Sequence, residues 1–245
     1  MCELLGMSAS TPTDIIFGLK TLAQRGGLES PHRDGWGIAF YSGSDIQLFR
    51  DATSIAESAI ANLLQTHPIE SETVIAHIRH ANVGNVCLSN THPFSRELWG
   101  QNWAFAHNGQ LTEFRAGAGI YQAIGGTDSE AIFCDLLNRI RALHTGRIEF
   151  EIILPILLEA CAFYKMQGPF NCLLSNGEWL FSFCSTKLAS LTGPKKTASS
   201  TDKNKDDVVT VIATEPLSVD KNWDLFASGE WRLWQSGLLA ASGRV

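Results

Sequence analysis

The chain has 245 residues, 44% of them hydrophobic, with a formal net charge of −6 at pH 7, which suits one packed domain over 1–245. The acidic balance argues against binding nucleic acid or a membrane surface, because both require clustered Lys and Arg to meet phosphates. The N-terminus has no secretory pattern and the longest apolar run is broken by Pro155, so we expect a cytoplasmic protein with no membrane span.

The first half of the chain alternates between helical and strand patterns. The spacing of apolar residues predicts a helix that is capped by residues 10–13 and ends at Gly26-Gly27. A second helix is expected from Ser54, because Ser54 and Glu57 form a capping-box pattern ahead of an apolar stripe. Strands are expected at 37–41, 46–49, 74–79 and 103–107.

The second half opens with the clearest helix, which starts at the capping-box segment 127–130. A fourth helix is expected over much of 149–167, with Pro155 in its first turn or at a kink. Asn176-Gly177 is a strong hairpin signal. It separates strand patterns at 171–175 and 178–183, and further strands are expected at 208–213, 231–234 and 238–241.

The order of these elements favours a layered α+β domain, since strands occur in antiparallel hairpins and helices in pairs. The polar segment 195–207 has no periodicity and predicts a mobile surface loop inserted within this domain. No Cys-x-x-Cys pair is present among the six cysteines, so reduced thiols are expected. Five of them lie in apolar or strand contexts that predict burial: Cys87, Cys134, Cys161, Cys172 and Cys184.

The remaining cysteine, Cys2, directly follows the initiator methionine. If Met1 is removed, Cys2 becomes the first residue and carries both a thiol and an α-amine. An α-amine with a pKa of about 7.7–8.0 can take the thiol proton directly or through one water, which activates the sulfur as a nucleophile. A cysteine at this position is most often incidental, so a catalytic interpretation depends on partners elsewhere in the chain.

Several polar motifs lie where apolar strand patterns run into turn residues. Taken singly, each is an ordinary glycine-rich turn or helix start. They are Arg25-Gly26-Gly27, Asp34-Gly35-Trp36-Gly37, His77-Ile78-Arg79-His80, Asn90-Thr91-His92-Pro93-Phe94, His107-Asn108-Gly109 and Thr127-Asp128-Ser129-Glu130.

In this order, and together with Cys2, the motifs resemble those of the class II glutamine amidotransferases, N-terminal-nucleophile hydrolases that release ammonia from glutamine. The resemblance runs from Cys2 to the segment 213–215 and is closest to the short stand-alone members, the YafJ-type group. It implies a four-layer αββα sandwich of two mostly antiparallel sheets between helix layers, and no metal or organic cofactor. One departure is the segment 28–33, which is longer than in the synthase-linked members.

The chemistry of glutamine agrees with the roles that the resemblance implies. Arg79 suits the α-carboxylate, because a guanidinium binds a carboxylate with two parallel hydrogen bonds. The resemblance assigns the α-ammonium to Asp128 and the oxyanion hole to the Asn108 side chain and the Gly109 N–H. Supporting roles are assigned to Arg25, His80 and Trp36, with core packing an equal interpretation for Trp36.

Four histidines could suggest a metal site: His77, His80, His92 and His107. No cysteine or carboxylate falls at ligand spacing among them. A continuous strand would place Arg79 on one face with His77 and would place His80 on the other. We therefore expect no metal.

The resemblance implies hydrolysis of the glutamine side-chain amide to glutamate and ammonia through a Cys2 γ-glutamyl thioester. Because little chain follows position 215, ammonia would pass to a separate synthetase subunit. An alternative is a γ-glutamyl hydrolase that uses the same residues on a small γ-glutamyl compound. A third is a non-catalytic binding module, which retention of Met1 would favour because the nitrogen of Cys2 would then be an amide.

Overall fold

The computed structural model describes residues 2–25, 33–81, 84–112, 114, 116–143, 145–147, 149–194, 207–219 and 222–245. Several segments that carry sequence predictions lie outside the described residues. They are Met1, the helix end at Gly26-Gly27, most of the lengthened segment 28–33 and nearly all of the predicted loop 195–207.

Two antiparallel sheets form the middle of the molecule. One contains β1 (Glu3–Thr13), β2 (Trp36–Ser42), β3 (Asp45–Asp51), β4 (Ser71–Ile78), β9 (Ala189–Pro194), β10 (Val208–Ala213) and β11 (Asp224–Leu225), in the order β11-β9-β10-β1-β4-β2-β3. The other contains β5 (Phe94–Leu98), β6 (Gln101–Gly109), β7 (Phe170–Ser175), β8 (Leu180–Cys184), β12 (Glu230–Gln235) and β13 (Leu238–Arg244), in the order β13-β12-β8-β7-β6-β5.

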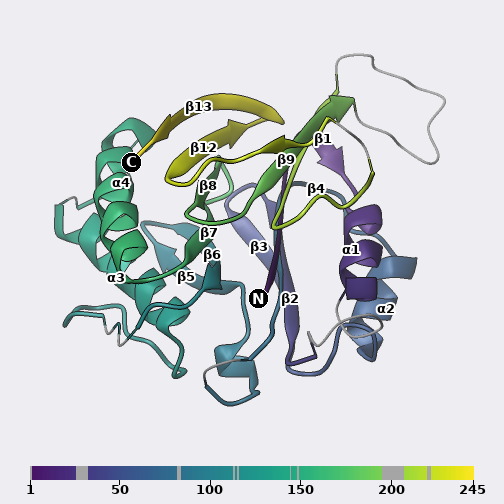
Figure 1. Ribbon diagram of the computed structural model, residues 1–245, viewed down its shortest axis with the longest axis horizontal. Coiled ribbons are helices and arrows are strands. Elements are labelled where there is room, and N and C mark those ends of the chain that lie inside the picture. Colours follow the sequence, from purple (N-terminus) through teal and green to yellow (C-terminus); the bar gives the residue numbers. More distant parts are fainter. Residues whose placement is uncertain are drawn as a thin grey trace.

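Helices cover the outer face of each sheet, as Figure 1 shows. The pair α1 (Ile16–Ala23) and α2 (Ala59–Thr66) lies on one side of the molecule, and the pair α3 (Asp128–Leu143) and α4 (Phe150–Gln167) lies on the other. A short 3-10 turn, η2 (Leu88–Asn90), precedes β5. The four-layer αββα prediction is therefore confirmed.

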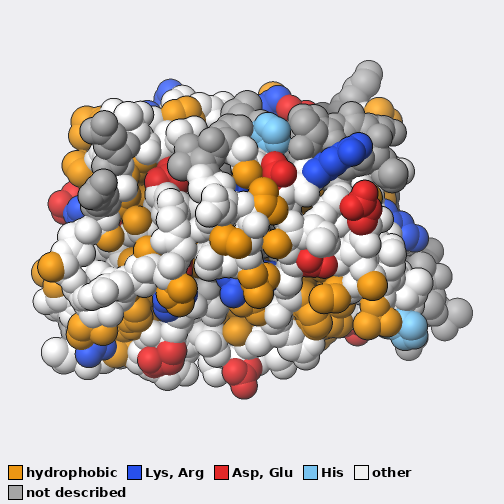
Figure 2. Space-filling model, turned by 90° about the horizontal axis from the view of Figure 1, so that it is seen from below, with side chains coloured by type: hydrophobic (Ala, Val, Ile, Leu, Met, Phe, Trp, Pro, Cys, Tyr) orange, Lys and Arg blue, Asp and Glu red, His pale blue; other side chains and the backbone are white. Residues whose placement is uncertain are grey.

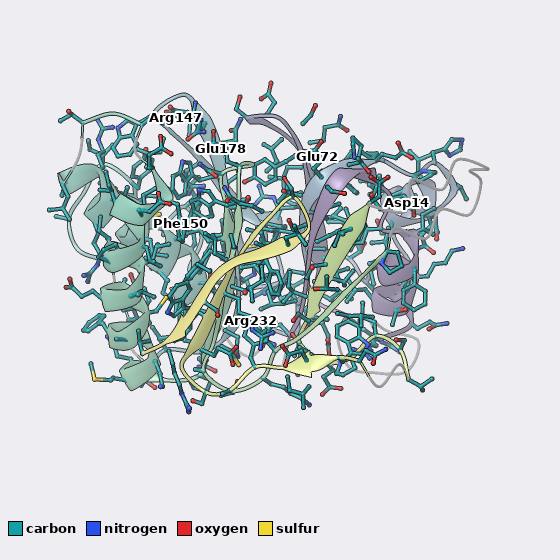
Figure 3. All side chains as sticks on the ribbon, turned by 90° about the horizontal axis from the view of Figure 1, so that it is seen from above. Asp14, Glu72, Arg147, Phe150, Glu178 and Arg232 are labelled. Carbon is teal, nitrogen blue, oxygen red and sulfur yellow. The ribbon has the colours of Figure 1, made fainter. Side chains whose placement is uncertain are left out.

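Among the residues that the structure describes, three hydrophobic cores hold the four layers together. One lies between α1, α2 and the first sheet, one between α3, α4 and the second sheet, and one between the sheets. Adjacent residues of β1 serve different cores, since Leu4 packs between the sheets and Leu5 packs toward the helices. Seen from above with all side chains drawn, these spaces are filled (Figure 3).

The first helix prediction is wrong at its N-terminus. Residues 10–13 end the central strand β1 rather than cap a helix. The helix α1 begins only at Ile16, whose N–H donates to Asp14 Oδ1 at 3.1 Å. Leu5, Met7 and Ala9 alternate with small or polar residues along β1, but Ser10 to Thr13 lie just before an apolar helical pattern and were therefore interpreted as its cap.

The second helix prediction is right in kind but too early along the chain. Ser54 forms a turn, in which its carbonyl accepts the Glu57 N–H at 3.0 Å. The N-cap of α2 is Ser58, whose Oγ accepts the Ala61 N–H at 3.4 Å. The third prediction is confirmed, because α3 begins at Asp128 and the Glu130 N–H donates to Thr127 Oγ1 at 3.3 Å.

The fourth helix is confirmed, but Pro155 lies in its second turn rather than its first. The helix begins where the Phe150 ring packs against Trp179, with ring centroids 4.9 Å apart, and where Arg147 pairs with Glu178 (Figure 3). The predicted hairpin is also confirmed: β7 and β8 flank a turn in which Gly177 has a φ of +94°. Strands β1, β5, β9 and β11 are additional to the predicted set.

All six cysteines are free thiols, and four of them are buried. The prediction of burial is wrong for Cys87, which is partly exposed and contacts Ser89 Oγ at 3.2 Å. None of the helices in the described part of the chain is long and apolar enough to cross a bilayer. Figure 2, a view from below, shows hydrophobic side chains in several groups on that face, with charged groups scattered around them.

Candidate active site

A pocket of about 210 Å³ collects residues that are far apart in the sequence. Cys2 and Arg79 lie next to the ends of β1 and β4, which are neighbours in one sheet. Asn108 lies in β6 of the other sheet, and Asp128 is in the first turn of α3. Six of the eight predicted site residues line this pocket: Cys2, Arg79, His80, Asn108, Gly109 and Asp128.

Cys2 is partly exposed at the start of β1, and its sulfur faces the backbone of His80. The Sγ atom lies 3.3 Å from the His80 N–H nitrogen and 3.5 Å from the His80 carbonyl oxygen. Burial raises the pKa of the Cys2 thiol above its usual value, and the His80 N–H opposes this in part. The thiol is therefore mainly protonated at neutral pH and needs a base before it can attack.

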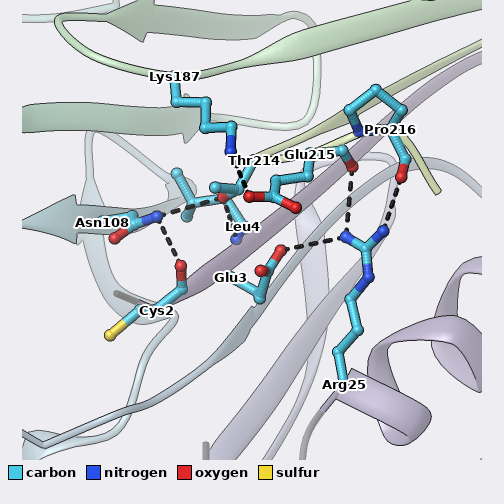
Figure 4. Close-up of polar contacts among 9 residues, drawn as sticks. All are labelled: Cys2, Glu3, Leu4, Arg25, Asn108, Lys187, Thr214, Glu215 and Pro216. Carbon is cyan, nitrogen blue, oxygen red and sulfur yellow. Dashed lines mark hydrogen bonds and ion pairs between the residues drawn. The ribbon is translucent and has the colours of Figure 1, made fainter. Parts of the chain in front are cut away.

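Asn108 holds the segment at Cys2 from the opposite sheet (Figure 4). Its Nδ2 donates to the Cys2 carbonyl oxygen at 2.6 Å and to Thr214 Oγ1 at 3.2 Å. These two bonds use both hydrogens of the amide nitrogen. Because the Cys2 carbonyl oxygen can only accept a hydrogen bond, the Asn108 atom that faces it must be Nδ2 rather than Oδ1. An oxyanion arriving at Nδ2 would replace one of them, and the longer bond to Thr214 is the weaker of the two.

Gly109 is required by the close approach of another strand. A Cβ atom there would lie 1.8 Å from the Pro169 carbonyl oxygen and 2.6 Å from His107 Nε2. Any side chain would push β6 away from the start of β7, so only glycine keeps the backbone of residue 109 at the wall of the pocket.

The two charged residues of the pocket are held by backbone groups. Arg79 Nη1 donates to the Asn85 carbonyl oxygen at 2.9 Å, and Nη2 donates to that of Gly84 at 3.2 Å. The Asp128 carboxylate accepts the Leu111 N–H at 2.7 Å and the Ser129 N–H at 2.9 Å. These bonds fix the orientation of both side chains beside the pocket.

The expectation that His80 lies on the opposite face from Arg79 is wrong. The strand β4 ends at Ile78, so the period of two does not extend to these residues, and both line the pocket. The Nδ1 atom of His80 lies 3.7 Å from Asp34 Oδ2, which also accepts the Ala81 N–H at 2.8 Å.

The other two predicted residues lie outside the pocket lining. Arg25 donates to the Pro216 carbonyl oxygen at 2.6 Å and pairs with Glu3 at 3.5 Å, so it ties the start of β1 to the segment after β10 (Figure 4). Trp36 is 1% exposed and belongs to the core beneath α1 and α2. The position of Trp36 therefore favours core packing over pocket lining.

Sequence reasoning missed Thr214, which had appeared only as the end of the family resemblance. Its Oγ1 accepts the Leu4 N–H at 2.9 Å as well as the Asn108 bond, and its own N–H donates to the Leu4 carbonyl at 3.1 Å. Since Thr214 and Asn108 are 106 residues apart, no local motif could have linked them.

Buried imidazoles lie beside the site. The rings of His77 and His92 are 4.1 Å apart, and His107 Nδ1 lies 2.9 Å from Ser129 Oγ. Burial lowers the pKa of His92 well below its usual value and lowers that of His107 as well. The described residues contain no group of three His, Cys, Asp or Glu side chains placed to hold a metal ion.

These pKa shifts predict a loss of stability in weak acid. Above about pH 6.5 both histidines are neutral whether the chain is folded or not, but at lower pH only the unfolded chain takes up their protons. We expect the free energy of unfolding to fall by up to about 1.4 kcal/mol per pH unit for His92 between pH 6.5 and 5. Urea denaturation should show a shallower pH dependence for His92→Gln and an unchanged one for the exposed control His67→Gln. Equal slopes in all three proteins would contradict the prediction.

Comparison with known proteins gives one consistent family. The model of the class-II glutamine amidotransferases matches residues 1–245. The chain is 45% identical over 255 residues to "Putative glutamine amidotransferase YafJ" of Escherichia coli K12, covering 97% of this chain and 98% of that protein. It is 38% identical to a similarly named protein of Haemophilus influenzae, over 97% of this chain and 85% of that protein.

Comparison with solved structures gives the same result. A "predicted glutamine amidotransferase" from Pseudomonas aeruginosa superimposes with a TM-score of 0.79 at 48% identity, covering 98% of this chain and all of that one. The glutamine phosphoribosylpyrophosphate amidotransferase of B. subtilis shares the fold, with a TM-score of 0.65 at 15% identity, over 99% of this chain and 49% of that one. The match along the whole chain and the near full-length relatives show that the protein belongs to the class II glutamine amidotransferases.

Proposed function

We propose that the protein hydrolyses the side-chain amide of glutamine to glutamate and ammonia, with Cys2 as nucleophile. The observation that carries the proposal is the pocket that brings together a thiol, an amide donor, a guanidinium and a carboxylate. These are the groups that an amide nucleophile, its oxyanion and the two charges of an α-amino acid require.

Substrate recognition in this proposal uses the two charged side chains. Arg79 binds the α-carboxylate and Asp128 binds the α-ammonium, so the amide end of glutamine extends toward Cys2. The ordered carbonyl partners of Arg79 and the N–H partners of Asp128 support these assignments, because preoriented charges lose little entropy on binding.

The chemical step is acyl transfer. The Cys2 sulfur attacks the amide carbon, and the carbon–nitrogen bond breaks as the thiol proton reaches the leaving nitrogen, which departs as ammonia. Asn108 and the Gly109 N–H bind the oxyanion of the tetrahedral intermediate. Water then attacks the γ-glutamyl thioester, which releases glutamate and restores the thiol.

The base of this reaction is the α-amine of Cys2, which exists only after Met1 is removed. The raised pKa of the Cys2 thiol supports the need for such a base, because little thiolate is present at neutral pH without one. The His80 backbone N–H and the Arg25 contacts act in support by holding the sulfur and the start of β1.

We further propose that residues 1–245 act as one amidotransferase unit and that the ammonia is used by a separate protein. The amidophosphoribosyltransferase of Pyrococcus horikoshii is 27% identical to this chain over 176 residues. This chain matches only 36% of that protein.

The experiment that tests the proposal combines a mass measurement with an assay. Protein whose N-terminal cysteine has been established by mass spectrometry is incubated with glutamine and with several γ-glutamyl amides. We expect glutamate and ammonia in a ratio of one to one from glutamine. Release of a larger amine in preference to ammonia would support a γ-glutamyl hydrolase instead. No turnover of any compound by the processed protein would contradict the proposal.

A further inference from the structure

The two charged residues proposed to bind glutamine come from different parts of the chain. Arg79 follows β4, whereas Asp128 begins α3. Both charges of an α-amino acid are attached to one carbon atom, so a site that binds both must keep its cation and its anion at a fixed separation. The contacts that set this separation therefore affect substrate binding directly.

Asn90, the last residue of η2, lies between the segments beside these two residues and is 4% exposed. Its Nδ2 donates to the Asn85 carbonyl oxygen at 2.9 Å, and its Oδ1 accepts the Gly126 N–H at 2.8 Å. The Asn85 oxygen also accepts the bond from Arg79 Nη1 at 2.9 Å. A continuous chain of hydrogen bonds thus runs from the guanidinium to the backbone that enters α3.

The Asn90 amide fits this place in one orientation only. Exchanging its oxygen and nitrogen would set donor against donor at Gly126 and acceptor against acceptor at Asn85. The backbone on each side is also close: a Cβ on Gly125 would lie 2.2 Å from Asn90 Oδ1, and one on Gly84 would lie 3.1 Å from Nδ2. The side chain is therefore held firmly between the two segments.

We infer that Asn90 is a positioning residue that sets the separation of Arg79 and Asp128 and so selects substrates with both an α-carboxylate and an α-ammonium group. This inference rests on the proposed function, because it takes Arg79 and Asp128 as the ends of the glutamine site. Asn90 is not one of the residues that line the pocket. Its effect on the substrate passes through the hydrogen bonds described above.

The test measures ligand binding by calorimetry to protein that carries Cys2→Ala, in which no ligand is consumed. The ligands are glutamine and glutaramate, which is glutamine without its α-amino group. Adding Asn90→Ala is expected to raise the dissociation constant of glutamine about tenfold. This is the change expected when about one to two hydrogen bonds that align the site are lost. Glutaramate binding should change less than about twofold, because this ligand has no ammonium to place against Asp128.

Ser89→Ala is the matched control, since Ser89 lies in the same turn and its Oγ contacts Cys87. It should change neither dissociation constant. Equal weakening of both ligands by Asn90→Ala, or no weakening, would overturn the inference. If Asn90→Ala does not fold, Asn90→Ser is neutral and keeps one hydroxyl group in the same buried place, and the same unequal weakening of the two ligands is expected; equal weakening would again count against the inference.

The same data separate this inference from the proposed function. If the Cys2→Ala protein binds glutamine with the expected dependence on Asn90, but processed wild-type protein turns over none, the positioning role stands and the hydrolysis fails. If the Cys2→Ala protein binds no glutamine, the positioning role itself is wrong.

Discussion

Replacing Cys2 by alanine is expected to lower kcat for glutamine hydrolysis by about 10³-fold or more, because the covalent route is then closed. The effect should fall on kcat rather than on glutamine binding, since Arg79 and Asp128 remain. Steady-state assays of glutamate formation, together with the dissociation constant of glutamine, check both parts. Activity within about tenfold of wild type would show that Cys2 is not the nucleophile.

Cys87 provides a matched control, because it is the other cysteine that is not buried. Its bond with Ser89 lowers the pKa of the Cys87 thiol, whereas burial raises that of Cys2. In protein that retains Met1, and therefore lacks the α-amine base at Cys2, a simple alkylating agent such as iodoacetamide should react faster with Cys87 at pH 7. Glutamine should protect only Cys2, and Cys87→Ala should retain full activity; protection of Cys87 alone would contradict the assignment.

Replacing Asn108 by alanine is expected to lower kcat by about 10²–10³-fold, the usual cost of losing one oxyanion donor. In this protein the substitution also removes the 2.6 Å bond to the Cys2 carbonyl, so the nucleophile loses part of its support. The KM for glutamine should change much less, because the amide of Asn108 takes no part in binding the α-carbon end. Single-turnover measurements of thioester formation check the effect on the chemical step.

Asn102→Ala is the control for this substitution, since Asn102 lies on the same strand and its side-chain amide donates to the Ser44 carbonyl oxygen and to Asp45 Oδ1. It should leave kcat unchanged. A second variant, Thr214→Val, keeps Asn108 but removes one acceptor of its amide, and a loss smaller than that of Asn108→Ala is expected. If Asn108→Ala raised KM and left kcat unchanged, the oxyanion role would be excluded.

Local sequence signals predicted the elements that have one exposed face or a distinctive start. The helices α3 and α4 and the hairpin around Gly177 agree with their expected positions, because capping residues, helical spacing and a turn glycine are encoded within a few residues. The strand β1 was missed. Leu5, Met7 and Ala9 alternate along it, but Ser10 to Thr13 resembled a cap ahead of an apolar helical pattern, and the pairing with β4 and β10 that makes these residues a strand joins distant segments.

The candidate site likewise combines residues that local motifs predicted with contacts that they did not. The ordered motifs identified Cys2, Arg79, Asn108, Gly109 and Asp128 as one set, and these residues share a pocket. The contacts that support these residues could not be predicted from the sequence, because each joins segments that meet only in the folded chain. The amide of Asn108 depends on Thr214, and the carbonyl partner of Arg79 is shared with Asn90.

Family membership, the layered α+β architecture and the candidate site residues could thus be predicted from the amino-acid sequence, since they depend on local pattern and on the order of motifs. The folded structure was needed to see that Trp36 packs in the core, that His80 offers its backbone to the Cys2 sulfur, and that Asn90 connects the backbone beside Arg79 to the backbone that enters α3. Hydrogen-bond partners and burial are set by contacts between distant segments, which periodicity and spacing along the chain do not encode.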